Sequence, residues 1–225
     1  MKGFVITIVD LPQSVSSAEK TILSGTQHGF PDIEMFTAIT PQKNDPHELF
    51  KKEKLDPKIF LKNDFSRVES AMSCFLSHYF LWKKCIELNT PIAIFEHDAI
   101  FTTQFDHSLG ERIRSACNIG RPSFGNFKKS KKTGVQPLFS KKYFPGAHGY
   151  IVAPYGAKQF TRYAQVFTPK PTDVFLNKET FSELQEHNPY FVEVQESFST
   201  VQVEKGCKAK YAYQRNPDKY DIIEL

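Results

Sequence analysis

The sequence has no apolar run of about 18 residues, the length that a membrane-spanning helix needs, so we expect no transmembrane segment. The N-terminal stretch MKGFVITIVDLP also lacks the small-residue cleavage site of a signal peptide, because its short apolar run meets Asp10 and Pro12. We therefore predict that this run is a buried strand. We also predict a cytoplasmic protein, either free or bound peripherally at a membrane surface.

Cysteine is scarce, with four residues in 225, and none of them stands in a CxxC pair. Their spacing fits neither a zinc site nor a disulfide framework. Without a signal peptide, free thiols in a reducing cytosol are the simpler prediction. The four residues are Cys74, Cys85, Cys117 and Cys207.

Acidic residues are absent from Arg112 to Lys170, a stretch that holds 12 lysines and arginines. The rest of the chain has 17 basic and 25 acidic residues, a net charge of −8, although the whole chain is at +4. Such a segment is commonly a solvated surface, and the alternative is contact with an anionic ligand or partner. Lysines interleaved with aromatic residues suit a phosphorylated acceptor or a nucleic acid. The candidates are Lys128, Lys129, Lys131 and Lys132, in the segment 121–146.

The remainder of the sequence alternates between strand and helix patterns, which is typical of an α/β domain. A β-branched run at 4–9, a helical stretch with Ser and Pro start signals, and a second strand at 32–40 predict a parallel pair. The clearest helix, 70–89, leads into a strand at 92–101. Shorter patterns predict a strand at 150–153, a helix at 155–167, and loop excursions at 41–68 and 121–146. We predict one domain, 1–225, with a mainly parallel central sheet flanked by helices.

The strand 92–101 reads IAIFEHDAIF, so Glu96, His97 and Asp98 interrupt an apolar run. In open α/β sheets, ligands bind outside the carboxyl ends of the strands. Because side chains two positions apart on a strand point the same way, Glu96 and Asp98 would aim two carboxylates at one cation. Mg²⁺ and Mn²⁺ take such oxygen ligands together with substrate phosphates. On spacing alone, a polar turn after the strand explains the same residues.

The helix and the strand together, SCFLSHYFLWKKCIELNTPIAIFEHDAIF, resemble the signature of glycosyltransferase family 25. These are the lipooligosaccharide-type galactosyltransferases, related to the collagen galactosyltransferases. The family shows a Gly-Cys-x-x-Ser-His helix, a Trp four residues later, and a strand that ends in Glu-Asp-Asp-Ala. The segments FVITIVD, FTAIT, GAHGYIVAPYGAKQF and KPTDVFL resemble other parts of the family in the same order. The matching signature residues are Cys74, Ser77, His78, Trp82, Cys85, Glu96, Asp98 and Ala99.

The resemblance implies a GT-A-like fold and the transfer of a sugar from a nucleotide-diphospho-sugar, with a UDP-hexose as the first expectation. The acceptor it implies is a hydroxyl of a lipooligosaccharide-type glycan, with inversion at the sugar. Glu96 and Asp98 would hold Mn²⁺ or Mg²⁺ against the diphosphate leaving group. A modified nucleic-acid acceptor is an alternative because of the basic segment. A non-catalytic sugar- or nucleotide-binding protein on a decayed transferase fold is another.

The sequence departs from the family pattern in three places. His97 replaces the central acid, Ser73 replaces the helix glycine, and the stretch PQSVSSAEK after the first strand has no arginine. The first change is tolerable if the outer two acids carry the metal. If the central position is itself a ligand, His97 would supply a nitrogen and favour Mn²⁺ over Mg²⁺.

Other candidate residues each have a structural alternative. The resemblance places Ser77 and His78 near the nucleotide or acceptor pocket, whereas the alternative for His78 is a core histidine. Asp173 follows the prolines of PKP, so it is either a helix N-cap or the base that takes the proton from the acceptor hydroxyl. His148 and His187 are further candidates for that base.

Two loop positions complete the set of candidates. Asp10 follows the first strand, where it would contact uracil or ribose, or lie in an ordinary strand-end turn. Gly146, His148 and Gly149 form a predicted turn, in which glycine would allow close approach of a sugar or phosphate. An ordinary turn is the alternative there too.

Overall fold

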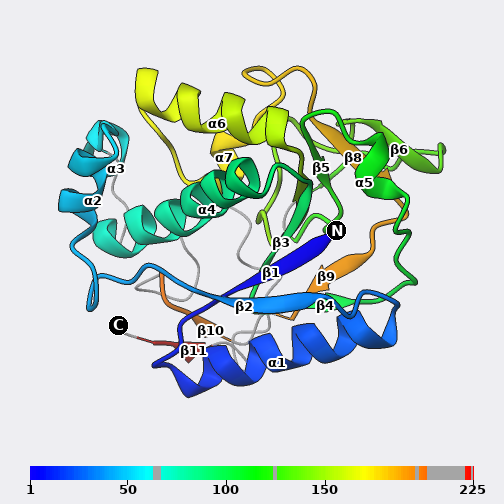
Figure 1. Cartoon of the computed structure of the whole chain (residues 1–225), viewed down its shortest axis with the longest axis horizontal. Helices are drawn as coiled ribbons and strands as arrows, with labels where there is room; N and C mark the ends of the chain where they lie inside the picture. The colour runs from blue at the N-terminus through cyan, green and yellow to red at the C-terminus, as the bar shows by residue number, and fades with distance from the viewer. Residues whose placement is uncertain (63–66, 124–125, 196–197, 202–220, 224) are drawn as a thin grey trace.

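The computed structural model describes residues 1–62, 67–123, 126–195, 198–201, 221–223 and 225. Its centre is a seven-stranded sheet in the order β2-β1-β3-β7-β5-β8-β6 (Figure 1). Five strands run in one direction, and β7 and β6 run against them. The predicted α/β class with a mainly parallel sheet is therefore confirmed. The strands are β1 (Lys2–Thr7), β2 (Ile33–Thr37), β3 (Ile92–Glu96), β5 (Ala116–Asn118), β6 (Gly134–Pro137), β7 (Gly149–Val152) and β8 (Gln185–Asn188).

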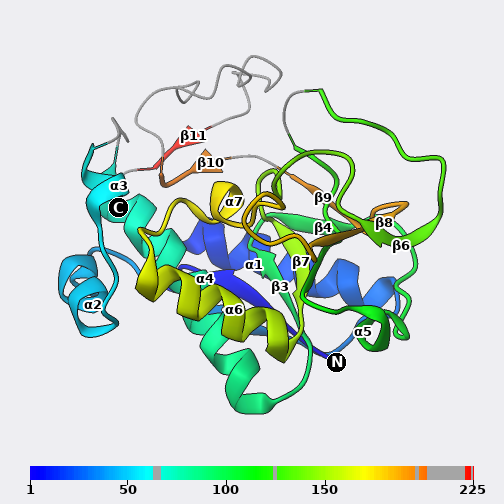
Figure 2. The same cartoon turned by 90° about the horizontal axis from the view of Figure 1, so that it is seen from above.

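Helices cover both faces of this sheet (Figures 1 and 2). Helix α1 (Pro12–Gln27) packs on one face, and α4 (Val68–Leu88) and α6 (Pro154–Val166) pack on the other. Within the described ranges, no helix is both long enough and apolar enough to cross a membrane. The shorter helices are α2 (Pro46–Lys52), α3 (Lys58–Lys62), α5 (Leu109–Arg112) and α7 (Thr172–Phe175).

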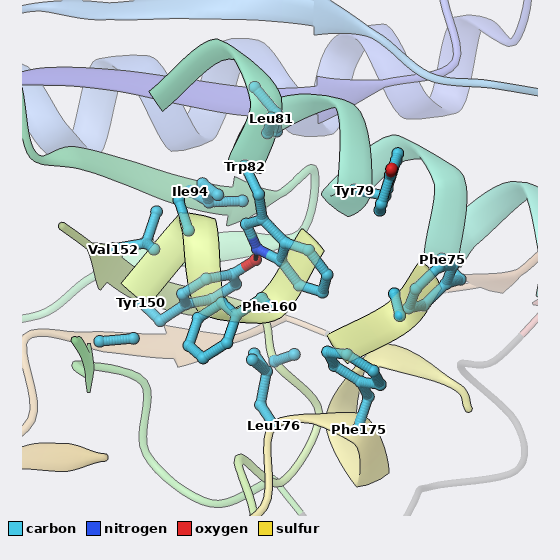
Figure 3. Close-up of a cluster of buried hydrophobic side chains, with 14 of the residues drawn as sticks. Phe75, Tyr79, Leu81, Trp82, Ile94, Tyr150, Val152, Phe160, Phe175 and Leu176 are labelled. Atoms are coloured by element: carbon cyan, nitrogen blue, oxygen red, sulfur yellow. Dashed lines mark hydrogen bonds between the residues drawn. The ribbon is translucent and has the colours of Figure 1, made fainter. Parts of the chain in front are cut away.

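Helix α4 is the central element of the larger core. It follows the predicted helix 70–89 closely and ends at Asn89, whose left-handed conformation (φ 49°) closes the last turn. Trp82 of α4 stacks on Phe175, with ring centroids 5.4 Å apart, and meets Phe160 of α6 edge-on (Figure 3). Burial of each such apolar side chain stabilises the fold by about 1.5–3 kcal/mol, which fixes α4 against the sheet.

Strand β3 separates the two cores. Ile94 belongs to the core beneath α4 and α6, and Phe95 belongs to the core beneath α1. Because side chains alternate along a strand, Glu96 continues the row that faces α4, and the next residue, His97, continues the row that faces α1. The end of β3 therefore directs Glu96 and His97 to opposite faces of the sheet.

The predicted strand 92–101 is not continuous, and this part of the prediction is wrong. β3 ends at Glu96, His97 and Asp98 form a turn, and β4 (Ala99–Phe101) leaves the central sheet to pair with β9 (Val192–Val194). The backbone N–H of Gln195 donates to the carbonyl of Asp98 at 2.8 Å, which holds the turn against the segment after β9. The alternation argument that aligned Glu96 with Asp98 therefore does not extend past Glu96.

The two predicted loop excursions contain regular structure. Helices α2 and α3 lie in 41–68, and β6 lies in 121–146, where it pairs with β8 at the edge of the sheet. Strands β5 and β8 were not predicted. The sequence of β8, QEHN, is polar and gives no strand signal, although its Glu186 and His187 are buried. A second small sheet pairs β10 (Phe198–Ser199) with β11 (Asp221–Ile222). The single-domain assignment stays a prediction.

Candidate active site

The order of the strands marks one place in the sheet where a ligand is expected. β2 and β3 lie on opposite sides of β1, and all three are parallel. At such a topological switch point, the connections leave toward opposite faces and open a crevice outside the carboxyl ends of the strands. Glu96 is the last residue of β3 and pairs with Ile6 of β1, so it lies at the carboxyl end of β3, where this crevice is expected.

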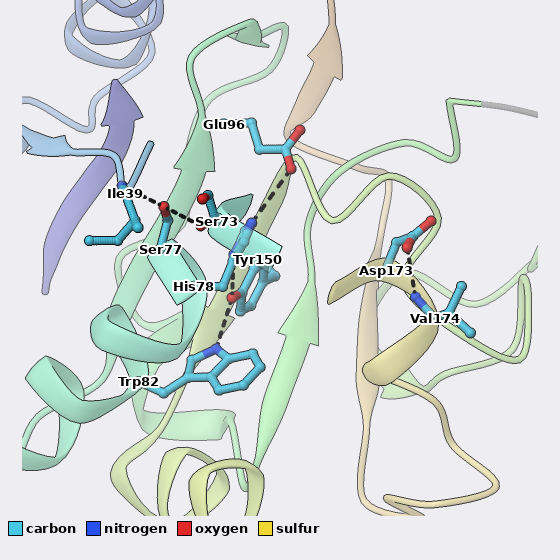
Figure 4. A network of polar contacts seen from close by, with 9 residues as sticks. All are labelled: Ile39, Ser73, Ser77, His78, Trp82, Glu96, Tyr150, Asp173 and Val174. Atoms are coloured by element: carbon cyan, nitrogen blue, oxygen red, sulfur yellow. Dashed lines mark hydrogen bonds and ion pairs between the residues drawn. The ribbon is translucent and has the colours of Figure 1, made fainter. Parts of the chain in front are cut away.

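Glu96 meets a buried chain of polar groups that runs out of the core (Figure 4). The indole Nε1–H of Trp82 donates to the hydroxyl of Tyr150 at 2.9 Å. The same hydroxyl lies 2.9 Å from Nδ1 of His78, and Nε2 of His78 lies 3.5 Å from Oε1 of Glu96. The His78 side chain is fully buried, whereas that of Glu96 is 32% exposed, so the chain ends at solvent.

The protons of this chain follow from its chemistry. Burial lowers the pKa of His78 to about 3, although the nearby charge of Asp173 acts in the opposite direction, so the ring is neutral at pH 7. Trp82 can only donate, so the Tyr150 hydroxyl accepts from it and has its own hydrogen left for Nδ1 of His78. We infer that the proton of the imidazole is on Nε2, directed at Glu96. The N–H of the neutral ring thus faces the carboxylate of Glu96, with the two heavy atoms 3.5 Å apart.

Cys74 adds a sulfur atom to this corner of the molecule. It lies one helical turn before His78 on α4, and its Sγ, a ring nitrogen of His78 and a carboxylate oxygen of Glu96 all lie within 4.8 Å of one another. Burial raises the pKa of the Cys74 thiol, and the charges of Glu96 and Asp173 raise it further. Cys74, Cys85 and Cys117 are free thiols, as predicted, and Cys207 lies outside the described residues.

Asp173 lies near the same corner. It is in the short helix α7, and its carboxylate accepts from the backbone N–H of Val174 at 2.8 Å (Figure 4). Burial raises the pKa of Asp173, against the effects of the backbone donors at Val174 and Asp173 itself and of the nearby His78. Asp173 is not the N-cap of α7, as one of the two predictions had it, because the helix begins at Thr172 and its N-cap is Pro171. A carboxyl group with a raised pKa near a crevice has the properties of a proton acceptor.

His97 lies on the opposite face of the sheet from His78. Its Nδ1 is 3.2 Å from the hydroxyl of Ser14 in α1, and its ring stacks on Phe198 with centroids 4.9 Å apart. Its backbone carbonyl accepts from the hydroxyl of Thr21 at 2.9 Å. Burial lowers the pKa of His97 to about 4. These contacts account for a histidine here, because the side chain anchors the β3–β4 turn to α1.

Ser77 makes two hydrogen bonds within the protein. Its hydroxyl donates to the carbonyl of Ser73 at 3.0 Å and accepts from the backbone N–H of Ile39 at 2.9 Å (Figure 4). The residue is buried and ties α4 to the segment after β2. Asp10 lies in the turn after β1, is largely exposed, and forms an ion pair with Lys43. The predicted ligand contacts of both residues stay predictions.

His148 is buried between two glycines. A Cβ atom at Gly120 would lie 2.6 Å from its Nε2, and one at Gly146 would lie 2.9 Å from its Nδ1. Neither ring nitrogen has a hydrogen-bond partner in the part of the chain that the structure describes, and burial lowers the pKa to about 4. Gly146 has φ +86° and belongs to the predicted turn. Gly149 does not, since it is the first residue of β7 and pairs with Phe95.

The remaining base candidate, His187, lies on β8. Its Nδ1 donates to the carbonyl of Pro189 at 2.6 Å, and its ring stacks on Phe191 with centroids 4.2 Å apart. These contacts hold the ring within the fold. The structure therefore gathers Glu96, His78 and Asp173 at one corner, and His187 is not part of the chain that reaches Glu96.

The predicted basic residues lie on the segment that leads into β6, at the edge of the sheet (Figure 2). Lys128, Lys129, Lys131 and Lys132 are exposed, and the ammonium group of Lys128 lies 5.7 Å from the ring centre of Phe139. Residues 124 and 125 of this segment lie outside the described residues. Contact with a phosphorylated acceptor or a nucleic acid stays a prediction.

This basic segment is anchored by a buried carboxylate. Glu186 of β8 accepts from the hydroxyl of Ser140 at 2.5 Å and from the side-chain amide of Gln136 at 3.1 Å. The side-chain amide of Asn188 also donates to the backbone carbonyl of Lys132 at 2.6 Å. These hydrogen bonds attach the segment that carries the lysines to β8.

Two residues of the site were not predicted as such. Tyr150 gives no local signal, because it is 72 positions from His78 and meets it only through the sheet. Cys74 has a recognisable signal, since residues four apart on a helix lie on the same face and Cys74 and His78 have that spacing.

The comparison with sequence families decides the relationship. The sequence model of "Glycosyltransferase family 25 (LPS biosynthesis protein)" matches residues 19–176, which include α4, β3, Tyr150 and Asp173. The chain belongs to glycosyltransferase family 25. The chain is 26% identical over 174 residues to "Lipooligosaccharide biosynthesis protein lic2B" of Haemophilus influenzae, covering 71% of this chain. It spans 62% of the length of that relative.

Solved structures add little to this family assignment. A putative glucose-1-phosphate thymidylyltransferase from Bacillus anthracis, in complex with a sucrose, is 12% identical, with a TM-score of 0.41 and 87% of each chain covered. The CTP:phosphocholine cytidylyltransferase of Streptococcus pneumoniae is 13% identical, with a TM-score of 0.37, covering 85% of this chain and 91% of its own. Likeness at this level carries no argument about a family 25 chain.

Proposed function

We propose that this protein is a glycosyltransferase that moves a sugar from a nucleotide-diphospho-sugar to a hydroxyl group of a lipooligosaccharide-type glycan. The observation that carries the proposal is the position of Glu96. It ends β3 at the switch point of the sheet, within the segment that matches family 25, and a buried chain of polar groups from α4 reaches it. The printed name of the relative in Haemophilus influenzae supports a lipooligosaccharide acceptor.

The proposed cofactor is a divalent cation of the Mg²⁺ or Mn²⁺ type, with Glu96 and Asp98 as its proposed oxygen ligands. Glu96 and Asp98 are both half-buried, and Glu96 is open to solvent on one side. Such a cation, when bound, would neutralise the charge that develops on the diphosphate leaving group. In this proposal, the neutral ring of His78 faces the carboxylate of Glu96 from the core side, with its Nε2 at 3.5 Å from Oε1.

Asp173 is the proposed base for inverting transfer. The acceptor hydroxyl must lose a proton as its oxygen attacks the sugar, and a carboxylate whose pKa is raised accepts that proton more readily. Asp173 has such a raised pKa and lies close enough to His78 and Cys74 to affect their titration. A UDP-hexose is the proposed donor, in line with the family resemblance.

The test is a panel of nucleotide sugars, each with and without Mn²⁺, read by thermal unfolding and by release of the nucleoside diphosphate. A donor at 100 times its Kd stabilises the folded state by about 2.7 kcal/mol. For a chain of this size, that corresponds to a rise in Tm of about 5–10 °C. Glu96→Gln and Asp98→Asn should lose the Mn²⁺-dependent part of the shift.

Glu193→Gln is the matched control, because Glu193 is an exposed carboxylate on β9 that pairs with Arg121 at 2.9 Å. It should keep the full shift. If Glu96→Gln and Asp98→Asn also keep it, the proposed metal position is wrong. If a donor binds but no nucleoside diphosphate is released with any acceptor glycan, the alternative of a non-catalytic binding protein is correct instead.

A further inference from the structure

The group formed by Cys74, His78 and Glu96 has a donor set of its own. It offers one sulfur, one nitrogen and one oxygen atom, all within 4.8 Å of one another. Two of the donors come from adjacent turns of α4 and the third from the end of β3, so the group spans a helix and the sheet. Cys74 and Glu96 are both half-buried, which leaves a path from solvent.

His78 gives an independent indication of a ligand at this point. Its side chain is fully buried, and its Nε2 has no hydrogen-bond partner among the residues that the structure describes. Oε1 of Glu96 is 3.5 Å away, which is longer than an ordinary N–H···O bond. Nδ1, by contrast, is fixed by Tyr150 at 2.9 Å. A buried polar atom aimed at two other donor atoms requires an explanation, and a bound ion supplies one.

We propose that Cys74, His78 and Glu96 form a binding site for a thiophilic divalent cation of the Zn²⁺ type. Zn²⁺ binds thiolate, imidazole and carboxylate ligands at about 2.0–2.3 Å, and sites with three protein ligands keep one position open. Ligand atoms around such an ion are about 3.3–3.8 Å apart by these bond lengths. The group therefore has to close by about 1 Å, which the half-exposed Glu96 side chain allows.

Binding of the cation changes the protonation of Cys74 and His78. The metal takes the place of the thiol proton of Cys74, which is released to solvent. The imidazole stays neutral: its proton moves from Nε2 to Nδ1 and is donated to the Tyr150 oxygen, while the hydroxyl hydrogen of Tyr150 turns away from the ring. Burial, with smaller contributions from the negative charges of Glu96 and Asp173, raises the pKa of the free thiol of Cys74, and the same two charges attract the cation.

The site shares Glu96 with the proposed donor site but requires no sugar transfer. It differs from a Glu96–Asp98 site in the sulfur ligand, and hard cations such as Mg²⁺ avoid sulfur. A cobalt(II) probe separates the two, because a Co²⁺–thiolate bond gives a charge-transfer absorption in the near ultraviolet that oxygen ligands do not give.

The experiment titrates the chelator-treated full chain with cobalt(II) chloride and then with zinc(II) chloride. We expect a saturable thiolate band at one ion per chain that zinc removes. Cys74→Ala should abolish the band. Cys117→Ala is the matched control, because Cys117 is a buried cysteine in the core on the α1 side of the sheet, and it should keep the band.

Glu96→Gln gives a second test that does not alter a buried side chain. It should weaken cobalt binding by about tenfold or more while leaving the band visible at saturation. The proposal is overturned if the unmodified chain gives no thiolate band, or if the band survives in Cys74→Ala. Failure of the proposed transferase would appear separately, as no Mn²⁺-dependent binding of any nucleotide sugar in the unmodified chain, and would leave the cobalt result unchanged.

Discussion

Tyr150→Phe removes one oxygen atom from the centre of the buried polar chain that reaches Glu96. Tyr150 is fully buried, and its hydroxyl serves both Trp82 and His78 at 2.9 Å. Phenylalanine keeps the ring contacts in the core but leaves the indole N–H and one imidazole nitrogen without a partner. Each buried polar group left unsatisfied costs about 1–3 kcal/mol.

The expected loss is about 2–4 kcal/mol, since the desolvation cost of the hydroxyl itself disappears with it. The folded state of a domain is typically stable by about 5–15 kcal/mol, so this is a large fraction. For a chain of this size, the corresponding fall in Tm is about 4–16 °C. Urea unfolding followed by far-ultraviolet circular dichroism measures the free energy, and differential scanning calorimetry measures Tm.

Tyr79→Phe is the control, because Tyr79 of α4 belongs to the same core as Tyr150. Its hydroxyl bonds to Glu53 at 3.3 Å and Gln165 at 3.2 Å, and both partners reach solvent. We expect it to cost about 0.5–1 kcal/mol, because water replaces the lost partner. If the two variants lose the same stability, the hydrogen bonds of the Tyr150 hydroxyl do not stabilise the fold more than those of a hydroxyl with solvent-exposed partners, and the reasoning about the buried chain is refuted.

Two further predictions concern acid and packing. Burial lowers the pKa of three histidines, His78 to about 3 and His97 and His148 to about 4, below the value of about 6.5 expected in the unfolded chain. The unfolded state then binds protons that the folded state does not bind, so stability is complete above pH 6.5 and falls as the pH drops toward 4. Each histidine costs about 1.4 kcal/mol for each pH unit below 6.5. The free energy of unfolding in urea should therefore be about 4 kcal/mol lower at pH 5.5 than at pH 7.5 for the three histidines together. Equal values would contradict the burial of these rings as neutral groups. Gly156→Ala should lower the free energy of unfolding by about 1–3 kcal/mol, because the new Cβ would lie 2.3 Å from the backbone carbonyl oxygen of Ser115. Gly110→Ala is the control, since the nearest atom to a Cβ there is 3.6 Å away. It should unfold at nearly the same temperature as the unmodified protein.

Local sequence patterns were sufficient for much of the fold. The first strand is a short apolar run with β-branched residues, α4 has an apolar face at steps of three and four residues, and the end of β3 is marked by a change from apolar to ionisable residues. β8 gave no such pattern. Its Glu186 is buried because it bonds to Ser140 and Gln136, residues about 50 positions away, so no local property distinguishes it from a loop.

The sequence by itself determined the class of fold, the family, and the candidates Glu96 and Asp173, since these depend on short motifs and on periods of two and 3.6 residues. Only the tertiary structure decided which way the ionisable residues after β3 point. Alternation along the strand directs Glu96 to α4 and His97 to α1, but whether those faces hold a histidine or a serine depends on helices placed by long-range packing. For the same reason Tyr150 was found only in three dimensions: hydrogen bonds form between neighbours in space, and strand β7 is brought beside β3 by the sheet.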